Sequence, residues 1–304
     1  MNSCTMSKAK AWITLMRLFA VPWIVINIML GVWYASYTGL SISLIDILMV
    51  ILACVVISLV LIGAHLHNAY KDYVYGYDKL ENGSTEKIYT SACGVIPSGV
   101  ISSRKVAISS ILCYSIASAL MLVYVLVDRC TTLIPFGLGM FAAVSYNEIF
   151  KRYGLMQEVG LFLGHGVTTV LMGYVSISNV ISLDSLLLCL PTGLFAAMML
   201  PIDQLPDVET DGFKHSTAAL LKKTGFPAYV FAGLAYAAVV SMQYLLVLVN
   251  ILPIRSMITL MEIPIVLIAM KALSIDSRFQ KGILIMLIAM MLYPILIIIG
   301  GAIL

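Results

Sequence analysis

Long apolar stretches recur along this chain and constrain its fold more than any other feature. From Trp12 to the final residue, Leu304, runs of about 20 predominantly apolar residues follow one another, which is the length an α-helix needs to cross a bilayer. Only 11% of the residues are charged, against roughly 25% in soluble domains, and the mean hydropathy is +1.02. We therefore expect an all-α integral membrane protein.

Charged residues and Pro/Gly clusters divide the chain into nine expected spans. These are residues 13–37, 44–68, 106–127, 131–150, 157–179, 183–203, 225–250, 254–273 and 281–303. We expect them to form a single transmembrane domain over residues 1–304, with the helices around a central cavity. Two long polar connections, at about 69–105 and 204–224, are expected to cap one face of this domain.

The basic residues indicate how the domain is oriented. If the N-terminus is cytoplasmic, only Arg129 and Arg255 of the 18 Lys and Arg residues fall on the outer side. Both cap loops then open on the cytoplasmic face, because an even number of spans separates them, and this hints at a repeated helical unit. We expect a multi-pass protein of the plasma membrane. The net charge of +3, without a basic run among aromatics, argues against a nucleic-acid partner.

Two acidic motifs stand where the cap loops begin. Asn68 and Asp72 are four residues apart and would share one face of a helix. In the second loop Asp203, Asp207 and Asp211 repeat at the same interval, and a continuing helix would align them unless the intervening proline ends it. These motifs place carboxylates at matching topological positions on one membrane face.

Carboxylates at this spacing repel one another, and a hard cation removes that cost. Mg²⁺ takes oxygen ligands and is commonly held by one or two carboxylates, with substrate phosphates completing its shell. A single such motif is typical of a solvated loop, whereas two motifs at matching positions favour a metal site that binds a diphosphate. Basic residues on the same face could contact phosphate oxygens, namely Lys71, Lys79, Lys151, Arg152 and Lys214.

The first acidic motif resembles that of the UbiA superfamily of intramembrane prenyltransferases. Asn68-xxx-Asp72-xxx-Gly76-x-Asp78 is similar to the menaquinone-type branch, which prenylates 1,4-dihydroxy-2-naphthoate. In the more common form of the motif the last acid stands where this chain has Gly76. The segment 205–211 resembles the second motif, although Asp203 stands where relatives commonly have asparagine.

Further residues extend the resemblance over nearly the whole chain. Tyr146 with Lys151 and Arg152 is similar to the tyrosine-plus-lysine element of the family. Arg17 matches an arginine that often enters the first helix, and Lys214 follows the second motif where a basic residue is frequent.

The resemblance implies Mg²⁺-dependent transfer of a polyprenyl group from an isoprenyl diphosphate to an aromatic acceptor in quinone biosynthesis, through an allylic carbocation. The implied metal ligands are Asn68, Asp72, Asp78, Asp203, Asp207 and Asp211. The implied catalytic residues are Asp72, Asp207, Lys151 and Tyr146. The implied diphosphate contacts are Lys71, Lys79, Arg152, Lys214 and Arg17.

Other readings remain open at this point. The acceptor could be a dihydroxynaphthoate, a hydroxybenzoate, or a glyceryl phosphate lipid of the archaeal type. A cation-coupled secondary transporter would also use carboxylates, although transporter sites favour the bilayer midplane rather than span ends. Glu262 lies inside an expected span, where we interpret it as a structural residue that pairs with Arg255.

Overall fold

The computed structural model describes residues 7–76, 94–208 and 216–302, without the side chains of Arg152 and Asp207. These ranges are helical and contain no strand. In chain order the elements are α1 (Lys8–Met16), η1 (Leu18–Ala20), α2 (Val21–Tyr37), α3 (Leu44–Tyr75), α4 (Ser103–Leu126), η2 (Cys130–Thr132), α5 (Leu133–Glu148), η3 (Phe150–Arg152), α6 (Met156–Leu161), η4 (Phe162–Val167), α7 (Thr168–Ser178), α8 (Leu183–Gln204), η5 (Leu205–Asp207), α9 (Thr217–Thr224), α10 (Ala228–Leu248), η6 (Ile254–Glu262), α11 (Ile263–Leu273), η7 (Asp276–Arg278) and α12 (Phe279–Ala302).

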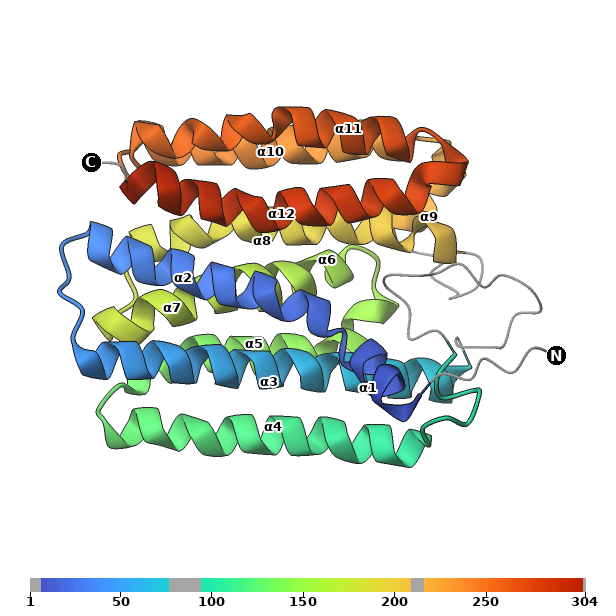
Figure 1. Ribbon diagram of the computed structural model, residues 1–304, viewed down its shortest axis with the longest axis horizontal. Helices are drawn as coiled ribbons and strands as arrows, with labels where there is room; N and C mark the ends of the chain where they lie inside the picture. Colours follow the sequence, from blue (N-terminus) through green and yellow to red (C-terminus); the bar gives the residue numbers. More distant parts are fainter. Residues whose placement is uncertain (1–6, 77–93, 209–215, 303–304) are drawn as a thin grey trace.

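Eight helical segments in the described ranges are long and apolar enough to cross a membrane. They are Leu18–Tyr37, Leu44–Tyr75, Ser103–Leu126, Met156–Ser178, Leu183–Gln204, Ala228–Leu248, Ile254–Leu273 and Asp276–Ala302. The fourth expected span corresponds to α5, whose 16 residues cover about 24 Å and which runs alongside α3 (Figure 1). The all-α membrane architecture with about nine helices is therefore confirmed.

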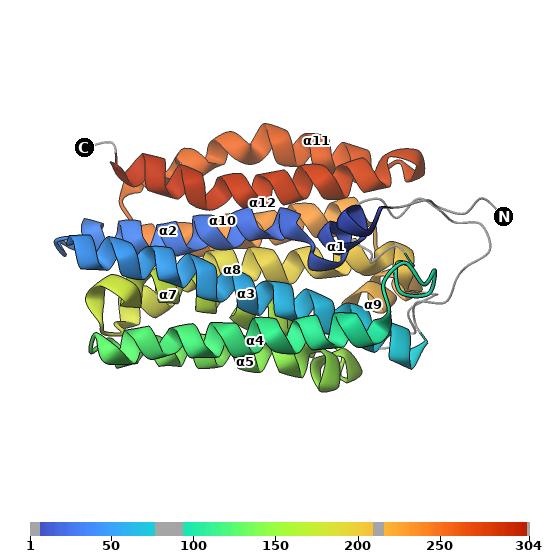
Figure 2. The same ribbon diagram turned by 60° about the horizontal axis from the view of Figure 1, so that its bottom comes forward.

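The helices form a bundle whose long axis they follow (Figure 1). In both views α11 and α12 lie on one side of the bundle and α4 and α5 on the opposite side (Figures 1 and 2). Between them, α2, α7 and α8 are the most enclosed, and most of the buried apolar side chains belong to one continuous cluster around them. The cavity expected between the helices stays a prediction.

Helix direction brings the two acidic motifs to the same end of the bundle. The carboxyl ends of α3 and α8 lie at this end together with α1 and α9, whereas α12 finishes at the other end (Figure 1). The even number of crossings between the two motifs accounts for this arrangement.

Helix α3 extends beyond the expected end of the second span. Helix α3 does not stop at residue 68 but continues to Tyr75, where Gly76 terminates it with φ 74°. Its 32 residues cover about 48 Å, which exceeds the roughly 30 Å hydrocarbon core of a bilayer. The last turns can therefore carry polar side chains on a rigid helix. In the second connection, residues 217–224 form the short helix α9.

Glycines allow α2 and α7 to approach at backbone distance. A Cβ atom at Gly31 would overlap the Val170 carbonyl oxygen, and one at Gly173 would overlap the Ile28 carbonyl oxygen. The same holds between Gly166 on η4 and Gly193 on α8. Small residues at such contacts are a common means of packing helices in membranes, where burial against lipid gives little driving force.

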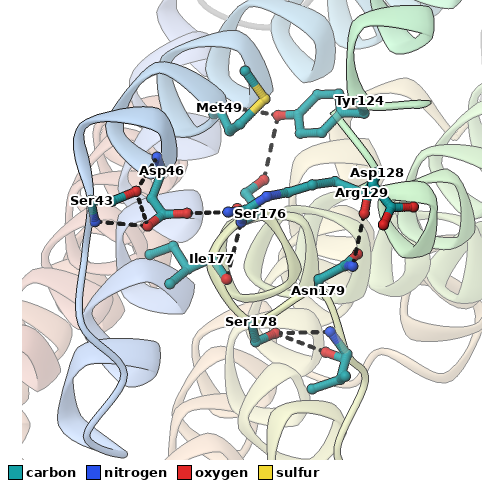
Figure 3. Close-up of polar contacts among 11 residues, drawn as sticks. Ser43, Asp46, Met49, Tyr124, Asp128, Arg129, Ser176, Ile177, Ser178 and Asn179 are labelled. Carbon is teal, nitrogen blue, oxygen red and sulfur yellow. Dashed lines mark hydrogen bonds and ion pairs between the residues drawn. The ribbon is translucent and has the colours of Figure 1, made fainter. Parts of the chain in front are cut away.

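A polar network lies where α3 begins, at the end of the bundle opposite the acidic motifs (Figure 1), and Figure 3 shows its contacts. The guanidinium of Arg129 forms an ion pair with Asp46 at the start of α3 and donates hydrogen bonds to the Ser176 and Ile177 carbonyl oxygens of α7. Asp46, only 4% exposed, also accepts hydrogen bonds from Ser43 and completes the cap of α3. Arg129 thus joins α3, α7 and the connection between α4 and α5.

Candidate active site

Asn68, Asp72 and Lys151 form the centre of the polar end of the bundle. Asn68 Nδ2 donates a hydrogen bond of 2.8 Å to Asp72 Oδ2, as expected for residues one helical turn apart on α3. Lys151 Nζ, on the short turn η3, donates to Asp72 Oδ1 at 2.6 Å. The Lys151 side chain is 9% exposed and that of Asp72 is 19% exposed, so the pair is largely shielded from solvent.

A second ion pair lies beside this group. Lys71 pairs with Glu148 at the end of α5 and stands 5.5 Å from the centre of the Tyr75 ring. His67 Nε2 lies 3.7 Å from the same carboxylate. Lys71 is therefore directed to Glu148, whereas Lys151 is directed to Asp72.

Tyr146 on α5 is the residue around which charges from four elements gather. The Lys151 ammonium lies 5.7 Å from the centre of its ring. The carboxylates of Asp72, Asp203 and Glu158 and the guanidinium of Arg17 all lie within electrostatic range of its hydroxyl. The α3, α5 and α8 ends are thus brought together with the start of the chain.

Arg17 reaches this site because the backbone turns sharply at that residue. It ends α1 in the left-handed conformation, with φ 47°, and the chain continues into η1 and α2. A non-glycine residue in this region is uncommon and marks an imposed turn. Arg17 is also close enough to His65 on α3 to act on it electrostatically.

Helix α6 is held against the end of α8 and against α5. Gln204 Nε2 donates a hydrogen bond of 2.7 Å to Gln157 Oε1, and both residues are buried. A Cβ atom at Gly160 would lie 2.6 Å from the Phe150 ring and 3.3 Å from the Tyr146 ring, so a larger residue would push α6 away. These contacts fix the position of Glu158, which lies between Gln157 and Gly160.

Several oxygens at this end are buried without a hydrogen-bond partner. They include Asn68 Oδ1 and both carboxylate oxygens of Glu158. Carboxylate and amide oxygens are the donors that Mg²⁺ prefers, so Asn68 and Asp72 are chemically suited to it. Within the described ranges no three His, Cys, Asp or Glu residues are arranged as a complete metal site.

Comparison with known proteins identifies the family. The sequence profile described as the UbiA prenyltransferase family matches residues 24–281. The chain belongs to the UbiA prenyltransferase family. No curated protein matches it. Its membership agrees with the apolar helices in making it a multi-pass integral membrane protein.

Solved structures have the same fold as this UbiA family member. One, of a digeranylgeranylglyceryl phosphate synthase in membranes, is 19% identical, covers 98% of this chain and 100% of its own, and has a TM-score of 0.59. A UbiA homolog from Aeropyrum pernix K1 is 17% identical, with 93% and 96% covered and a TM-score of 0.59. A UbiA homolog from Archaeoglobus fulgidus bound to DMAPP and Mg²⁺ is 15% identical, with 94% and 98% covered and a TM-score of 0.60.

The structure brings together some of the predicted site residues of this UbiA family member. Asn68, Asp72, Tyr146, Lys151 and Arg17 gather as described, and Asp203 lies on the last turn of α8 within range of Tyr146. Four predicted residues lie outside the described ranges: Asp78, Lys79, Asp211 and Lys214. Asp207 and Arg152 are described only in their backbone.

The structure decides between the two alternatives for the second motif. Helix α8 ends at Gln204 and passes into the 3₁₀ turn η5, which contains Pro206, as expected if the proline interrupts the helix. The proposed pairing of Glu262 with Arg255 is wrong. Glu262 is 1% exposed and neither of its carboxylate oxygens has a hydrogen-bond partner, whereas Arg255 is exposed on the surface.

Sequence reasoning missed two acidic residues at this end of the bundle. Glu148 follows Tyr146 by two residues and partners Lys71, a contact between α5 and α3 that no local pattern indicates. Glu158 lies inside the expected span 157–179, and an ionisable residue inside a span is itself a functional signal that could have drawn attention to it.

Proposed function

We propose that this chain transfers a polyprenyl group from an isoprenyl diphosphate to an aromatic acceptor in a Mg²⁺-dependent reaction. The observation that carries the proposal is the contact of Lys151 with Asp72, beside Asn68. In this contact a cation that suits phosphate oxygens is next to oxygen donors that suit a metal, at the end of an apolar bundle. This combination suits a substrate with a diphosphate head and a long hydrocarbon tail.

Asn68 and Asp72, with Asp203 and Asp207 from the other motif, are the residues that would hold the metal. Mg²⁺ bound there would neutralise negative charge on the departing diphosphate and favour cleavage of the allylic C–O bond. The bound relatives from Archaeoglobus fulgidus, one with DMAPP and Mg²⁺ and one with GPP and Mg²⁺, support this assignment. Asp78 and Asp211 complete the proposed ligand set.

The basic side chains would receive the diphosphate. Lys151, which contacts Asp72, could instead donate to phosphate oxygens of the donor, and such charge-assisted hydrogen bonds are among the strongest in proteins. Arg17 is close enough to Tyr146 to act on it electrostatically, and we propose it as a second contact. Lys71 is held by Glu148, so we expect it to contribute less to donor binding than Lys151. Lys79, Arg152 and Lys214 remain proposed contacts.

The remaining groups would protect and direct the reactive carbon. The allylic cation is attacked by water unless water is excluded, and the half-buried Tyr146 provides an aromatic surface next to the proposed diphosphate site. Aromatic rings attract cations through their faces. The isoprenoid tail would extend along the apolar helices toward the membrane interior.

A dihydroxynaphthoate is the acceptor that we propose first, because Gly76-x-Asp78 is similar to the menaquinone-type branch. A hydroxybenzoate is the aromatic alternative. A glyceryl phosphate lipid is the alternative of another chemical class, and one structure of the same fold is a synthase of such a lipid. Membership of a prenyltransferase family disfavours the transporter reading. We place the site on the cytoplasmic face, as the distribution of basic residues indicates.

The test is turnover of labelled geranylgeranyl diphosphate by the purified protein in detergent. Reactions contain Mg²⁺ or EDTA, and the acceptors are 1,4-dihydroxy-2-naphthoate, 4-hydroxybenzoate and geranylgeranylglyceryl phosphate. We expect metal-dependent transfer to the naphthoate. Transfer only to the glyceryl phosphate would overturn the aromatic assignment, and a protein that neither binds nor consumes the donor would overturn the proposed function.

A further inference from the structure

The carboxylate of Glu158 is not among the proposed metal ligands or diphosphate contacts of the donor site. Both of its oxygens are buried and neither has a hydrogen-bond partner, and its backbone lies in the first turn of α6, close in sequence to η3. Leaving an ionised carboxylate in this state is costly, because it has lost water and gained no donor. A ligand that supplies a hydrogen-bond donor would remove the cost.

The nearby lysines are already engaged elsewhere. Lys151 contacts Asp72, and Lys71 contacts Glu148. Glu158 therefore differs from the acids of this end that form ion pairs. Its position is nevertheless fixed, because the adjacent Gln157 is bonded to Gln204 on α8.

Glu158 lies on the side of Tyr146 that α6 covers. The ring of Tyr146 packs against Gly160, two residues beyond Glu158, and the Glu158 carboxylate is within electrostatic range of the Tyr146 hydroxyl. The Lys151 ammonium approaches the same ring from η3. A molecule beside Tyr146 can thus meet the cationic donor site and the Glu158 carboxylate at the same time.

We propose that Glu158 binds the prenyl acceptor by accepting a hydrogen bond from its hydroxyl group. This inference rests on the proposed function and specifies the acceptor half of the same site. The required chemistry is a neutral hydroxyl close to the carbon or oxygen that is prenylated, which a phenolic ring and a glyceryl lipid both possess. A phosphate or carboxylate group of the acceptor would have to point away from Glu158, since like charges repel at close range.

Glu158→Gln tests the inference with little change in shape, and Glu158→Asp keeps the charge on a shorter side chain. The matched control is Glu262→Gln. It makes the same substitution at another buried, unpartnered carboxylate, which lies at the end of η6, directly before α11. The probes are 1,4-dihydroxy-2-naphthoate, its methyl ethers as unreactive competitors, geranylgeranylglyceryl phosphate, and geranylgeranyl diphosphate with Mg²⁺. Steady-state kinetics and equilibrium binding of the donor are measured separately.

We expect Glu158→Gln to raise the acceptor KM by about 10- to 100-fold, the loss typical of a hydrogen bond to a charged group. The Kd of the donor with Mg²⁺ should stay within about twofold, and Glu158→Asp should recover part of the acceptor affinity. Methyl ethers that lack the hydroxyl should inhibit wild type and Glu158→Gln equally. Glu262→Gln should leave the acceptor KM unchanged. The acceptor whose KM responds identifies the source of the hydroxyl.

An unchanged acceptor KM in folded Glu158→Gln would overturn the inference while leaving the proposed function intact. Weaker binding of the donor with Mg²⁺ in this variant would also overturn it, because Glu158 would then belong to the donor site. If Glu158→Gln does not fold, an unchanged KM in Glu158→Asp decides against the inference in the same way. Failure of the wild-type protein to bind the donor would overturn the proposed function itself, together with this inference.

Discussion

Lys151 on η3 holds Asp72 on α3 through a 2.6 Å hydrogen bond, although 79 residues separate them in the chain. The contact neutralises two largely buried charges. It also means that a substitution of either residue leaves the other charge without its partner. Asp72→Asn and Lys151→Met therefore test the two partners of this contact one at a time.

Asp72→Asn should lower prenyl transfer by about 100-fold or more, because the amide removes a negatively charged metal ligand and with it much of the stabilisation of the leaving diphosphate. The amide preserves size, and Asn68 can still bond to its oxygen. Turnover at low and at saturating Mg²⁺ is the measurement, with thermal unfolding in detergent as the control for folding. If Asp72→Asn turned over as fast as the wild-type protein at low Mg²⁺, the proposed role of Asp72 as a metal ligand would be contradicted.

Lys151→Met should raise the KM for geranylgeranyl diphosphate by about 10- to 100-fold, since a charge-assisted contact to phosphate is lost. Lys71→Met is the comparison on the same end of the bundle, and we expect a smaller effect because Lys71 is held by Glu148. KM values for the donor are measured in both variants. An equal or larger effect of Lys71→Met would reverse the assignment of the two lysines.

Arg129→Met should destabilise the protein by about 3 to 5 kcal/mol, because Asp46 would remain buried without its partner. The double variant Asp46→Leu/Arg129→Met should recover part of this loss, since the uncompensated charge is gone. Thermal unfolding in detergent gives the order of stability. Turnover per folded molecule should be unchanged, because this network lies at the start of α3, at the opposite end from the acidic motifs (Figure 1). Equal stability of all three proteins would show that the pair contributes nothing.

Gly173→Ala should destabilise the bundle by at least about 1 to 3 kcal/mol, because its Cβ would overlap the backbone of α2 at Ile28 and force the helices apart. Gly137→Ala provides the control. A Cβ at Gly137 on α5 meets no atom within 4 Å, so there we expect no loss or a gain of about 0.5 to 1 kcal/mol from the better helix former. Unfolding midpoints of the two variants are compared, and similar midpoints would argue against the close α2–α7 contact.

Much of the architecture could be predicted from the sequence because it depends on local properties. The length of each apolar run determines where a helix can cross a bilayer, and nearly every expected span has its counterpart in the structure. The spacing of Asn68 and Asp72 determines that they meet on one helical face, which their hydrogen bond confirms. Helix ends were less predictable. Helix α3 runs past residue 68 because its polar last turns continue the helix until a glycine ends it.

Only the tertiary structure decided which charges meet. In the sequence, Lys71 and Lys151 are equivalent as basic residues of one membrane face. Because α5 and η3 approach α3, Lys71 forms an ion pair with Glu148, whereas Lys151 forms one with Asp72. Arg129, an exception to the distribution of basic residues, is explained by Asp46 and two carbonyl oxygens of α7. Glu158 became a candidate binding residue only because the structure shows that its carboxylate oxygens are buried without a hydrogen-bond partner. Local sequence determines the helices and the faces they present, whereas contacts between residues far apart in the chain depend on how those helices pack.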